Sequence, residues 1–202
     1  MTQMASAAAA SSLRGLAATF TRAQARRASI SDRTLNHLRE TGAIESIGRG
    51  LYRKTDSDIT ADIDLLEIAR RAPRATLCLT TALARHSLTD EIPPSIDAAL
   101  PRGQHRPITT APVTWHLFDR DSFDIGRTEM SLDENAAIGL YGPQRSIIDA
   151  IRLRHREGSA LGNIALKRWL ARPGSSPAEL LALARHFPQA EKALREALEI
   201  LL

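Results

Sequence analysis

One short segment carries side chains that can hydrogen-bond to the edges of nucleic-acid bases. Over residues 32–41, Leu35 and Leu38 share one face at helical spacing, which turns the intervening positions outward. The polar residues on and beside that outer face are Arg33, Thr34, Asn36 and His37. Arginine can donate to O6 and N7 of guanine, asparagine can pair with N6 and N7 of adenine, and threonine can contact a thymine methyl group or a phosphate. This composition is typical of a helix that reads the major groove, although His37 is equally well explained as a solvated surface residue.

Three further residues are placed to contact a phosphate backbone. Arg22 and Gln24 begin the preceding helical segment, where side chains and free backbone N–H groups suit a phosphate. Arg49 lies between Gly48 and Gly50, which allow a tight turn and a close approach to a duplex. We expect Arg49 to contact the minor groove or the DNA backbone.

Capping residues mark the helices that would position these side chains. Thr21 followed three residues later by Gln24 is a capping box for a short helix over 22–27. Ser31 is a second N-cap, and it predicts a helix over 32–41. The two predicted helices are therefore separated by only a few residues.

The pattern after this helix changes to that of a β-hairpin. Gly42 is a natural helix end, and short alternating strands follow over 43–47 and 51–53 around a glycine turn. An alanine-rich helix is expected within 7–18. This order of helices and hairpin predicts a winged helix-turn-helix. The alternative is a small helical subdomain with a hairpin and no ligand.

Charge is unevenly distributed along the 202 residues. Residues 1–54 contain nine Lys and Arg against three Asp and Glu, a formal charge of +6, whereas the remainder carries −2. A basic amino-terminal region on a nearly neutral body indicates a polyanionic partner for that region. The alternative is a solvated arginine-rich face, since only three of the 27 basic residues are lysine.

Composition excludes several classes of protein. Hydrophobic residues make up 43% and charged residues 25%, which is ordinary for a globular chain. The single cysteine, Cys78, excludes an intramolecular disulfide and a multi-cysteine zinc site. The longest charge-free run, residues 1–13, is too short for a transmembrane helix and lacks the pattern of a signal peptide. We therefore expect a cytoplasmic protein without membrane contact.

The sequence predicts an α+β protein with two domains. Residues 1–55 form the winged helix-turn-helix domain, and residues 60–202 form a mixed α/β domain with a C-terminal helical tail. The strands expected in this second domain cover 75–79, 95–100, 113–118, 128–132 and 137–141. The helices expected there cover 61–71, 80–87, 144–156, 159–170, 177–186 and 189–202.

Groups that could do catalysis are scattered through the second domain. They are Cys78, His86, Asp90, Glu91, His116, Asp149 and His155. Cys78 lies in an apolar strand, as core cysteines do, and His86 lies four residues before Asp90 without a nucleophile beside it. Asp149 is explained by an i,i+4 ion pair with Arg145. We expect no enzyme activity, no catalytic residues, no metal site and no cofactor.

Several segments resemble one known family. The hairpin turn 48–53 is similar to the Gly-x-Gly-x-Tyr wing of AbiEi-type antitoxins, which belong to the AbiE abortive-infection (type IV) toxin–antitoxin systems. The resemblance continues over 77–93, 98–103 and 141–150 and covers about 20–186. This chain has Arg145-Ser146 where the family pattern has Lys-Thr.

The resemblance implies a cytoplasmic antitoxin that binds promoter repeats in double-stranded DNA and represses its own operon. It also implies that the protein counteracts a nucleotidyltransferase-like toxin without a stable toxin complex. The chain would be a monomer or weak dimer in solution, with two copies, cooperative or not, on a DNA repeat. Two alternatives remain open: a winged-helix transcriptional regulator with a ligand-sensing or dimerisation domain and no toxin, and an enzyme with a DNA-anchoring head.

Overall fold

The computed structural model describes residues 11–56, 62–133, 136–188 and 190–201. The chain divides into two compact units. The first unit contains the chain up to Arg71 together with residues 108–110 and 131–137, and the second contains the rest. This division groups the helix at 63–71 with the amino-terminal elements.

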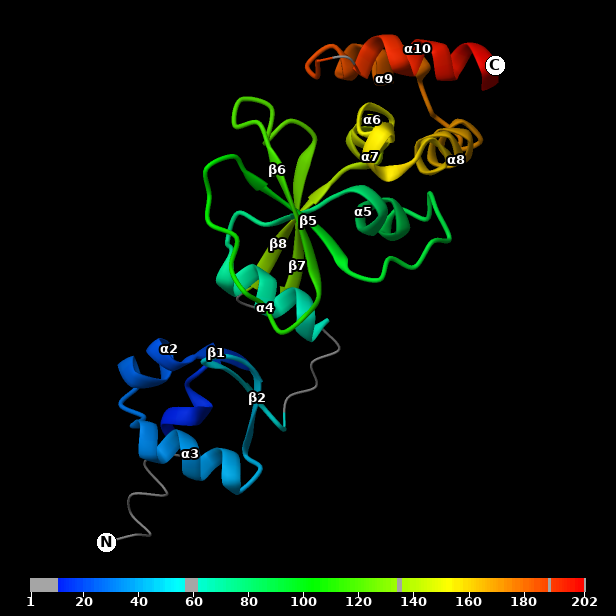
Figure 1. The fold of residues 1–202 in the computed structure, drawn as a ribbon. Helices are drawn as coiled ribbons and strands as arrows, with labels where there is room; N and C mark the ends of the chain where they lie inside the picture. The colour runs from blue at the N-terminus through cyan, green and yellow to red at the C-terminus, as the bar shows by residue number, and fades with distance from the viewer. Residues whose placement is uncertain (1–10, 57–61, 134–135, 189, 202) are drawn as a thin grey trace, which may run out of the picture. The chain divides into compact units, whose positions relative to one another are not determined.

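The first unit contains a winged helix, as the sequence predicts (Figure 1). Its elements are β1 (Thr19–Thr21), α2 (Arg22–Arg27), α3 (Asp32–Glu40), β2 (Ile44–Gly48), β3 (Leu51–Lys54) and α4 (Ile63–Arg71). The three strands form an antiparallel sheet in the order β1-β3-β2. Strand β1 was not predicted from the sequence. Its Phe20 pairs with Tyr52 of β3, and the centres of the two stacked rings lie 5.8 Å apart.

Local capping fixes the ends of the two short helices. The Thr21 hydroxyl accepts the Gln24 backbone N–H at 3.2 Å, and the Gln24 side chain accepts the Thr21 N–H at 2.7 Å, which completes the predicted capping box. The Ser31 hydroxyl accepts the Thr34 backbone N–H and caps α3. Gly42 follows α3 with a φ of +73°, the left-handed conformation that ends a helix.

A small apolar cluster holds the winged helix together. Its buried members are Phe20 of β1, Ala25 of α2, Ile30 between α2 and α3, Leu35 of α3 and Ile44 of β2. Leu38 packs against this cluster and is partly buried. At the amino-terminal side, residues 11–14 are helical and Gly15 follows as a turn, so the predicted helix ends earlier than residue 18. Its beginning lies outside the described residues.

The second unit is built on a five-stranded mixed sheet in the order β6-β5-β4-β8-β7, of which only the adjoining ends of the last two strands, residues 131–133 and 136–137, are grouped with the first unit. The strands are β4 (Thr76–Leu77), β5 (Ile96–Pro101), β6 (Val113–Phe118), β7 (Arg127–Asp133) and β8 (Ala136–Tyr141). Strand β4 is antiparallel to β5 and parallel to β8, while β5 and β6 are parallel. Strands β7 and β8 correspond to the strands expected over 128–132 and 137–141, and they are neighbours in this sheet. Residues 134–135 between them lie outside the described part.

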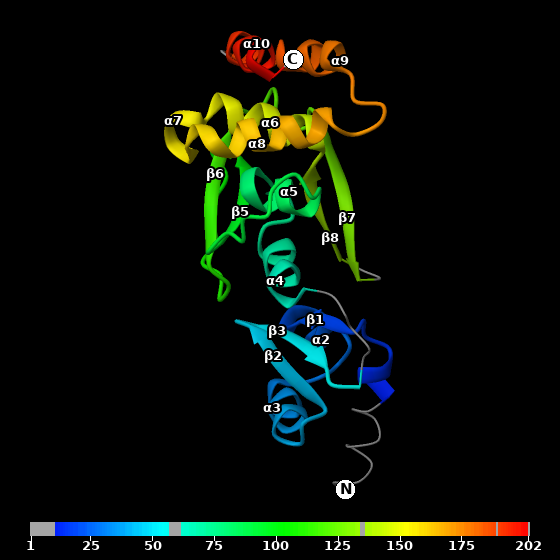
Figure 2. The ribbon, with the colours of Figure 1, turned by 90° about the vertical axis from the view of Figure 1, so that its right-hand side faces the viewer.

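Helices cover one side of this sheet and stack on one another. They are α5 (Leu79–Arg85), α6 (Pro143–Arg152), α7 (Arg154–Glu157), α8 (Ser159–Leu170), α9 (Pro177–Ala184) and α10 (Ala190–Leu201). Helix α6 packs against α5, α8, α9 and α10, and Figure 2 shows α9 and α10 lying over α6 and α8. The predicted α+β class with a C-terminal helical tail is therefore confirmed. Among the described residues, no helix is long and apolar enough to cross a membrane.

Two predicted boundaries in this unit are wrong. The strand over 75–79 is only two residues long, because Leu79 adopts a φ of +44° and already begins α5. The N-cap of α5 is consequently Cys78, and α5 begins one residue before the expected helix over 80–87. The helix over 144–156 is interrupted at Leu153, which ends α6 and precedes α7.

Candidate nucleic-acid interface

The outer face of α3 presents the predicted base-reading side chains together. Leu35 is 2% exposed and points into the apolar cluster. Arg33, Asn36 and His37 are all exposed on the same helix. The structure therefore brings these three side chains onto one accessible face, as their spacing predicts. Their contact with DNA stays a prediction.

Thr34 and Gln24 take part in capping. The Thr34 hydroxyl lies 2.9 Å from the Ser31 hydroxyl, and its backbone N–H donates to the same oxygen. The Gln24 carbonyl oxygen accepts the backbone N–H and the hydroxyl of Thr21. The side-chain oxygen of Gln24 is therefore occupied by capping, and the expected phosphate contact falls to its amide nitrogen. Both residues set the positions of the helix starts in addition to any contact with DNA.

Arg22 is fixed by an ion pair that joins α2 to α3. Its Nε donates to Asp32 Oδ1 at 2.8 Å and its Nη2 to Asp32 Oδ2 at 2.6 Å. Arg26 donates to the same Oδ2 at 2.6 Å. Hydrogen bonds from Arg22 and then Arg26 hold the pKa of the Asp32 carboxyl well below its usual range. The Asp32 hydrogen bond and charge raise the pKa of the Arg22 guanidinium.

This cluster extends the candidate interface beyond the sequence prediction. Asp32 lies in the first turn of α3, where a carboxylate favours the helix dipole. In the structure it also orients two guanidinium groups at the junction of the two helices, and one of them, Arg26, was not among the predicted site residues. The signal that could have identified Arg26 is its spacing of one helical turn from Arg22.

Arg49 is exposed at the tip of the β2–β3 turn. Its carbonyl oxygen accepts a hydrogen bond from Arg71 Nη2 at 3.2 Å, and Arg71 Nε pairs with Glu67 at 2.8 Å. A Cβ atom at Gly48 would lie 2.9 Å from Glu67 Oε1. The close approach at Gly48 is therefore to a side chain of α4, whereas Gly50, with a φ of +72°, is required by the turn itself.

His86 and Asp90, two of the candidate catalytic groups of the second unit, have separate partners. His86 Nε2 lies 2.8 Å from the Tyr141 carbonyl oxygen, while Asp90 pairs with Arg168 at 2.8 Å, so these two residues do not pair with each other. Cys78 is completely buried, and burial raises the pKa of its thiol. Within the described ranges, no group of three His, Cys, Asp or Glu residues could hold a metal ion.

Two buried polar pairs explain other candidates. His116 Nε2 lies 2.9 Å from Asp97 Oδ1, a pair that the sequence did not reveal because the residues lie on different strands. Arg145 Nε donates to Asp149 Oδ2 at 2.9 Å, and this confirms the predicted i,i+4 pair. Arg145 and Asp149 are both fully buried. The departure from the family pattern at Arg145 thus lies in the core and not on the surface.

Comparisons with known proteins agree with this architecture. The fold is similar to the crystal structure of the RV2827C protein from Mycobacterium tuberculosis, with a TM-score of 0.63 and 15% identity, over 96% of this chain and 76% of that one. At this identity the likeness concerns the fold alone. No curated protein matches this chain.

Residues 12–53 match the family described as "Transcriptional regulator, AbiEi antitoxin". The matched segment extends from the helical turn before β1 almost to the end of β3 and contains every predicted DNA-contacting residue. This match confirms the resemblance inferred from the hairpin turn 48–53, and it does not include the segments 77–93, 98–103 and 141–150. The winged-helix segment of this chain is therefore similar to the AbiEi antitoxin family of transcriptional regulators.

Proposed function

We propose that the protein binds the double-stranded promoter DNA of its own operon through the winged helix and represses transcription. The observation that carries this proposal is the exposed polar face of α3, with Arg33, Asn36 and His37 outward and Leu35 inward. Helix α3 enters the major groove, where arginine and asparagine discriminate guanine and adenine. The formal charge of +6 over residues 1–54 supplies the attraction to phosphate.

The other site residues have positioning roles in this proposal. The side chains of Arg22 and Gln24, at the start of α2, contact one sugar–phosphate backbone, whereas their backbone N–H groups donate to Gly50 and Thr21. The ion pair with Asp32 restrains the Arg22 side chain, so less conformational entropy is lost when it meets a phosphate. Arg49 contacts the minor groove or the backbone from the turn, and Thr34 reaches a methyl group or a phosphate.

A binding titration of the full chain against its upstream DNA tests the DNA contacts. Arg33→Ala should lose about 1–3 kcal/mol of discrimination between the operator and a scrambled duplex. Arg49→Ala should weaken binding to both duplexes alike and reduce the slope of log K against log salt by about one unit. Arg195→Ala is a charge-matched control, because Arg195 lies on α10 and pairs with Glu191. If the Arg33 and Arg195 variants discriminate equally well between the operator and the scrambled duplex, the proposed interface is contradicted.

The second part of the proposal is that the protein counteracts a nucleotidyltransferase-like toxin without a stable complex. Its support is the match of residues 12–53 to a family of antitoxin regulators. Co-expression with the toxin from the same operon should restore growth, whereas the two proteins should not co-purify. Intact operator binding without rescue would favour the alternative of a winged-helix regulator without a toxin. A regulator family does not support the third alternative, an enzyme with a DNA-anchoring head.

A further inference from the structure

The last residue of α6, Arg152, is held in a fixed orientation in the second unit. Its Nε donates to Asp149 Oδ1 at 2.7 Å. Its guanidinium lies 4.9 Å from the centre of the Phe118 ring and 5.8 Å from that of Phe187. The side chain is 20% exposed. Among the described residues, its two terminal nitrogens have no hydrogen-bond partner, so both NH₂ groups remain as donors for a ligand.

The group that orients Arg152 is itself rigidly supported. The second oxygen of Asp149 accepts from Arg145, and both residues are fully buried. Arg145 is enclosed by the rings of Tyr141 and Phe187, each 4.2 Å away, and it donates to two backbone carbonyls. A charged donor that is oriented in advance loses little entropy on binding, which favours recognition of an anion.

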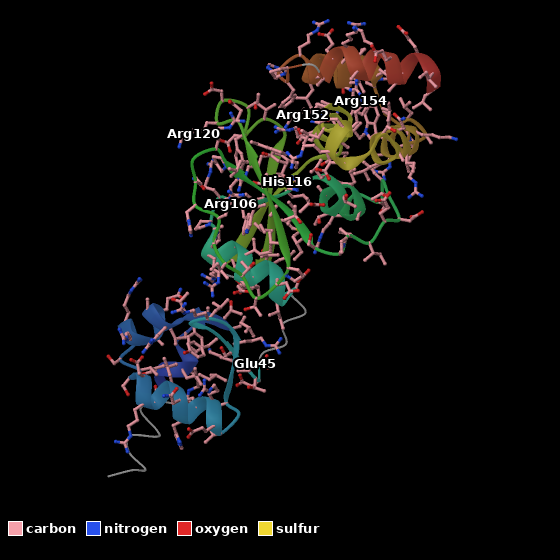
Figure 3. The ribbon with its side chains drawn as sticks, in the orientation of Figure 1. Glu45, Arg106, His116, Arg120, Arg152 and Arg154 are labelled. Atoms are coloured by element: carbon pink, nitrogen blue, oxygen red, sulfur yellow. The ribbon has the colours of Figure 1, made fainter. Side chains whose placement is uncertain are left out.

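A cavity of about 320 Å³ lies beside Arg152, between α6, α7 and α10. Its lining is mostly charged: Arg152, Arg154, His155, Lys192, Ala193 and Glu196. Figure 3 shows Arg152 and Arg154 at the side of α6 and α7 that faces α10. The volume is at the lower end of the range of small-molecule sites. Such a lining disfavours an apolar ligand.

The charges of this cavity are not neutralised by one another. Three cations face one carboxylate, which gives a formal charge of +2 with His155 neutral. Within the described part of the chain, Lys192 and Glu196 form no ion pair, although they are one turn apart on α10. Arg154 donates from Nη1 to the Ile151 carbonyl at 3.3 Å, and within the described residues its Nη2 has no hydrogen-bond partner.

We propose that this cavity binds the phosphate group of a small molecule. The two terminal nitrogens of Arg152 form the planar fork that pairs with two phosphate oxygens. Arg154 and Lys192 add charge at the rim, and Glu196 opposes it. The site lies in the second unit, so this inference does not depend on DNA binding by the winged helix.

Titration of the full ¹⁵N-labelled chain with inorganic phosphate, at constant ionic strength set by chloride, tests the proposal. Saturable shifts are expected for the amides of residues 152–156 and 192–196. Arg152→Ala should weaken binding about tenfold or more, because it removes the oriented charge-assisted hydrogen bonds. Shifts that do not saturate, or that concentrate on residues 22–40, would overturn the proposal.

Two exposed positions on α10 keep the test independent of folding. Lys192→Ala should weaken phosphate binding about two- to fivefold, and Glu196→Gln should strengthen it by a similar factor. Matched controls that do not line the cavity are Lys167→Ala and Glu199→Gln, which should leave the affinity unchanged. If Lys192→Ala and Lys167→Ala have the same affinity for phosphate, the cavity is not a phosphate site.

A nucleic-acid backbone is the competing occupant of a basic surface. A ten-nucleotide single strand, compared with inorganic phosphate at equal phosphate concentration, distinguishes the two. Preferential shifts of residues 152–156 and 192–196 by the oligonucleotide would overturn the small-molecule assignment. Stronger or equal shifts by inorganic phosphate would support it.

Discussion

Replacement of Asp149 by asparagine should destabilise the second unit strongly. The carboxylate accepts from Arg145 with one oxygen and from Arg152 with the other, and it is fully buried. Asp149→Asn leaves the buried guanidinium of Arg145 without its counter-charge. Breaking a buried pair in this way costs about 3–5 kcal/mol. At about 2–4 °C per kcal/mol for a protein of this size, Tm should fall by roughly 6–20 °C.

Thermal unfolding followed by tryptophan fluorescence measures this loss. Both tryptophans of the chain, Trp115 and Trp169, lie in the second unit. The matched control is Asp90→Asn, because Asp90 also pairs with an arginine, yet its side chain is 85% exposed. The Tm of the control should fall by only a small fraction of the decrease expected for Asp149→Asn, since exposed ion pairs contribute little to stability. Similar Tm values for the two variants would refute the argument that burial of the carboxylate decides the effect.

Four further predictions concern caps, backbone, acid and thiol. Ser31→Ala should weaken the winged helix by about 1 kcal/mol, because it removes the cap of α3, and faster amide exchange in α3 would reveal this. Gly126→Ala should destabilise the second unit by about 1–3 kcal/mol in urea titration, since Gly126 has a φ of +72° and its Cβ would lie 2.8 Å from that of Arg145. The pKa of Asp32 is lowered in the folded state, so its ion pairs stabilise the winged helix above about pH 4 and are lost as the pH falls through that lower pKa. Asp32→Asn should therefore make amide exchange in α3 less sensitive to acid. An unchanged dependence of this exchange on pH would contradict the argument. The buried Cys78 thiol, with its raised pKa, should react with a thiol reagent only at the rate of unfolding, so rapid reaction of the native chain would show that it is accessible.

Features set by neighbouring residues could be predicted from the sequence. The caps at Thr21 and Ser31 and the glycine after α3 each act within a few residues. The positions of α2 and α3 could therefore be predicted from the sequence. The alternation of Leu35 with exposed polar residues predicted the outer face of α3 for the same reason. In the second unit, the strand over 113–118 and the helix over 159–170 match their predicted ranges.

Features that depend on distant pairing could not be predicted. Strand β1 is only three residues long and exists because it pairs with β3, more than thirty residues later. The short strand β4 is likewise defined by its neighbours β5 and β8. Periodicity within such short segments carries no information about these partners.

The same limit applies to the functional groups. The Asp32 ion pairs with α2 depend on the angle between two helices, which the sequence does not reveal. Complete burial of Arg145 is exceptional for an arginine and results from aromatic rings and carbonyls contributed by three different segments. The charged cavity joins residues 152–155 to residues 192–196, which only the packing of α10 on α6 brings together.

Hydrogen–deuterium exchange of the full chain, with and without its upstream duplex, tests the central claim most directly. Reading of DNA by the winged helix predicts slower exchange at residues 33–37 in α3 and at the turn 48–50, with exchange at residues 143–201 unchanged. A scrambled duplex at the same salt concentration should protect these residues less. Protection confined to residues 143–201, or identical protection by the two duplexes, would contradict a sequence-reading interface on α3.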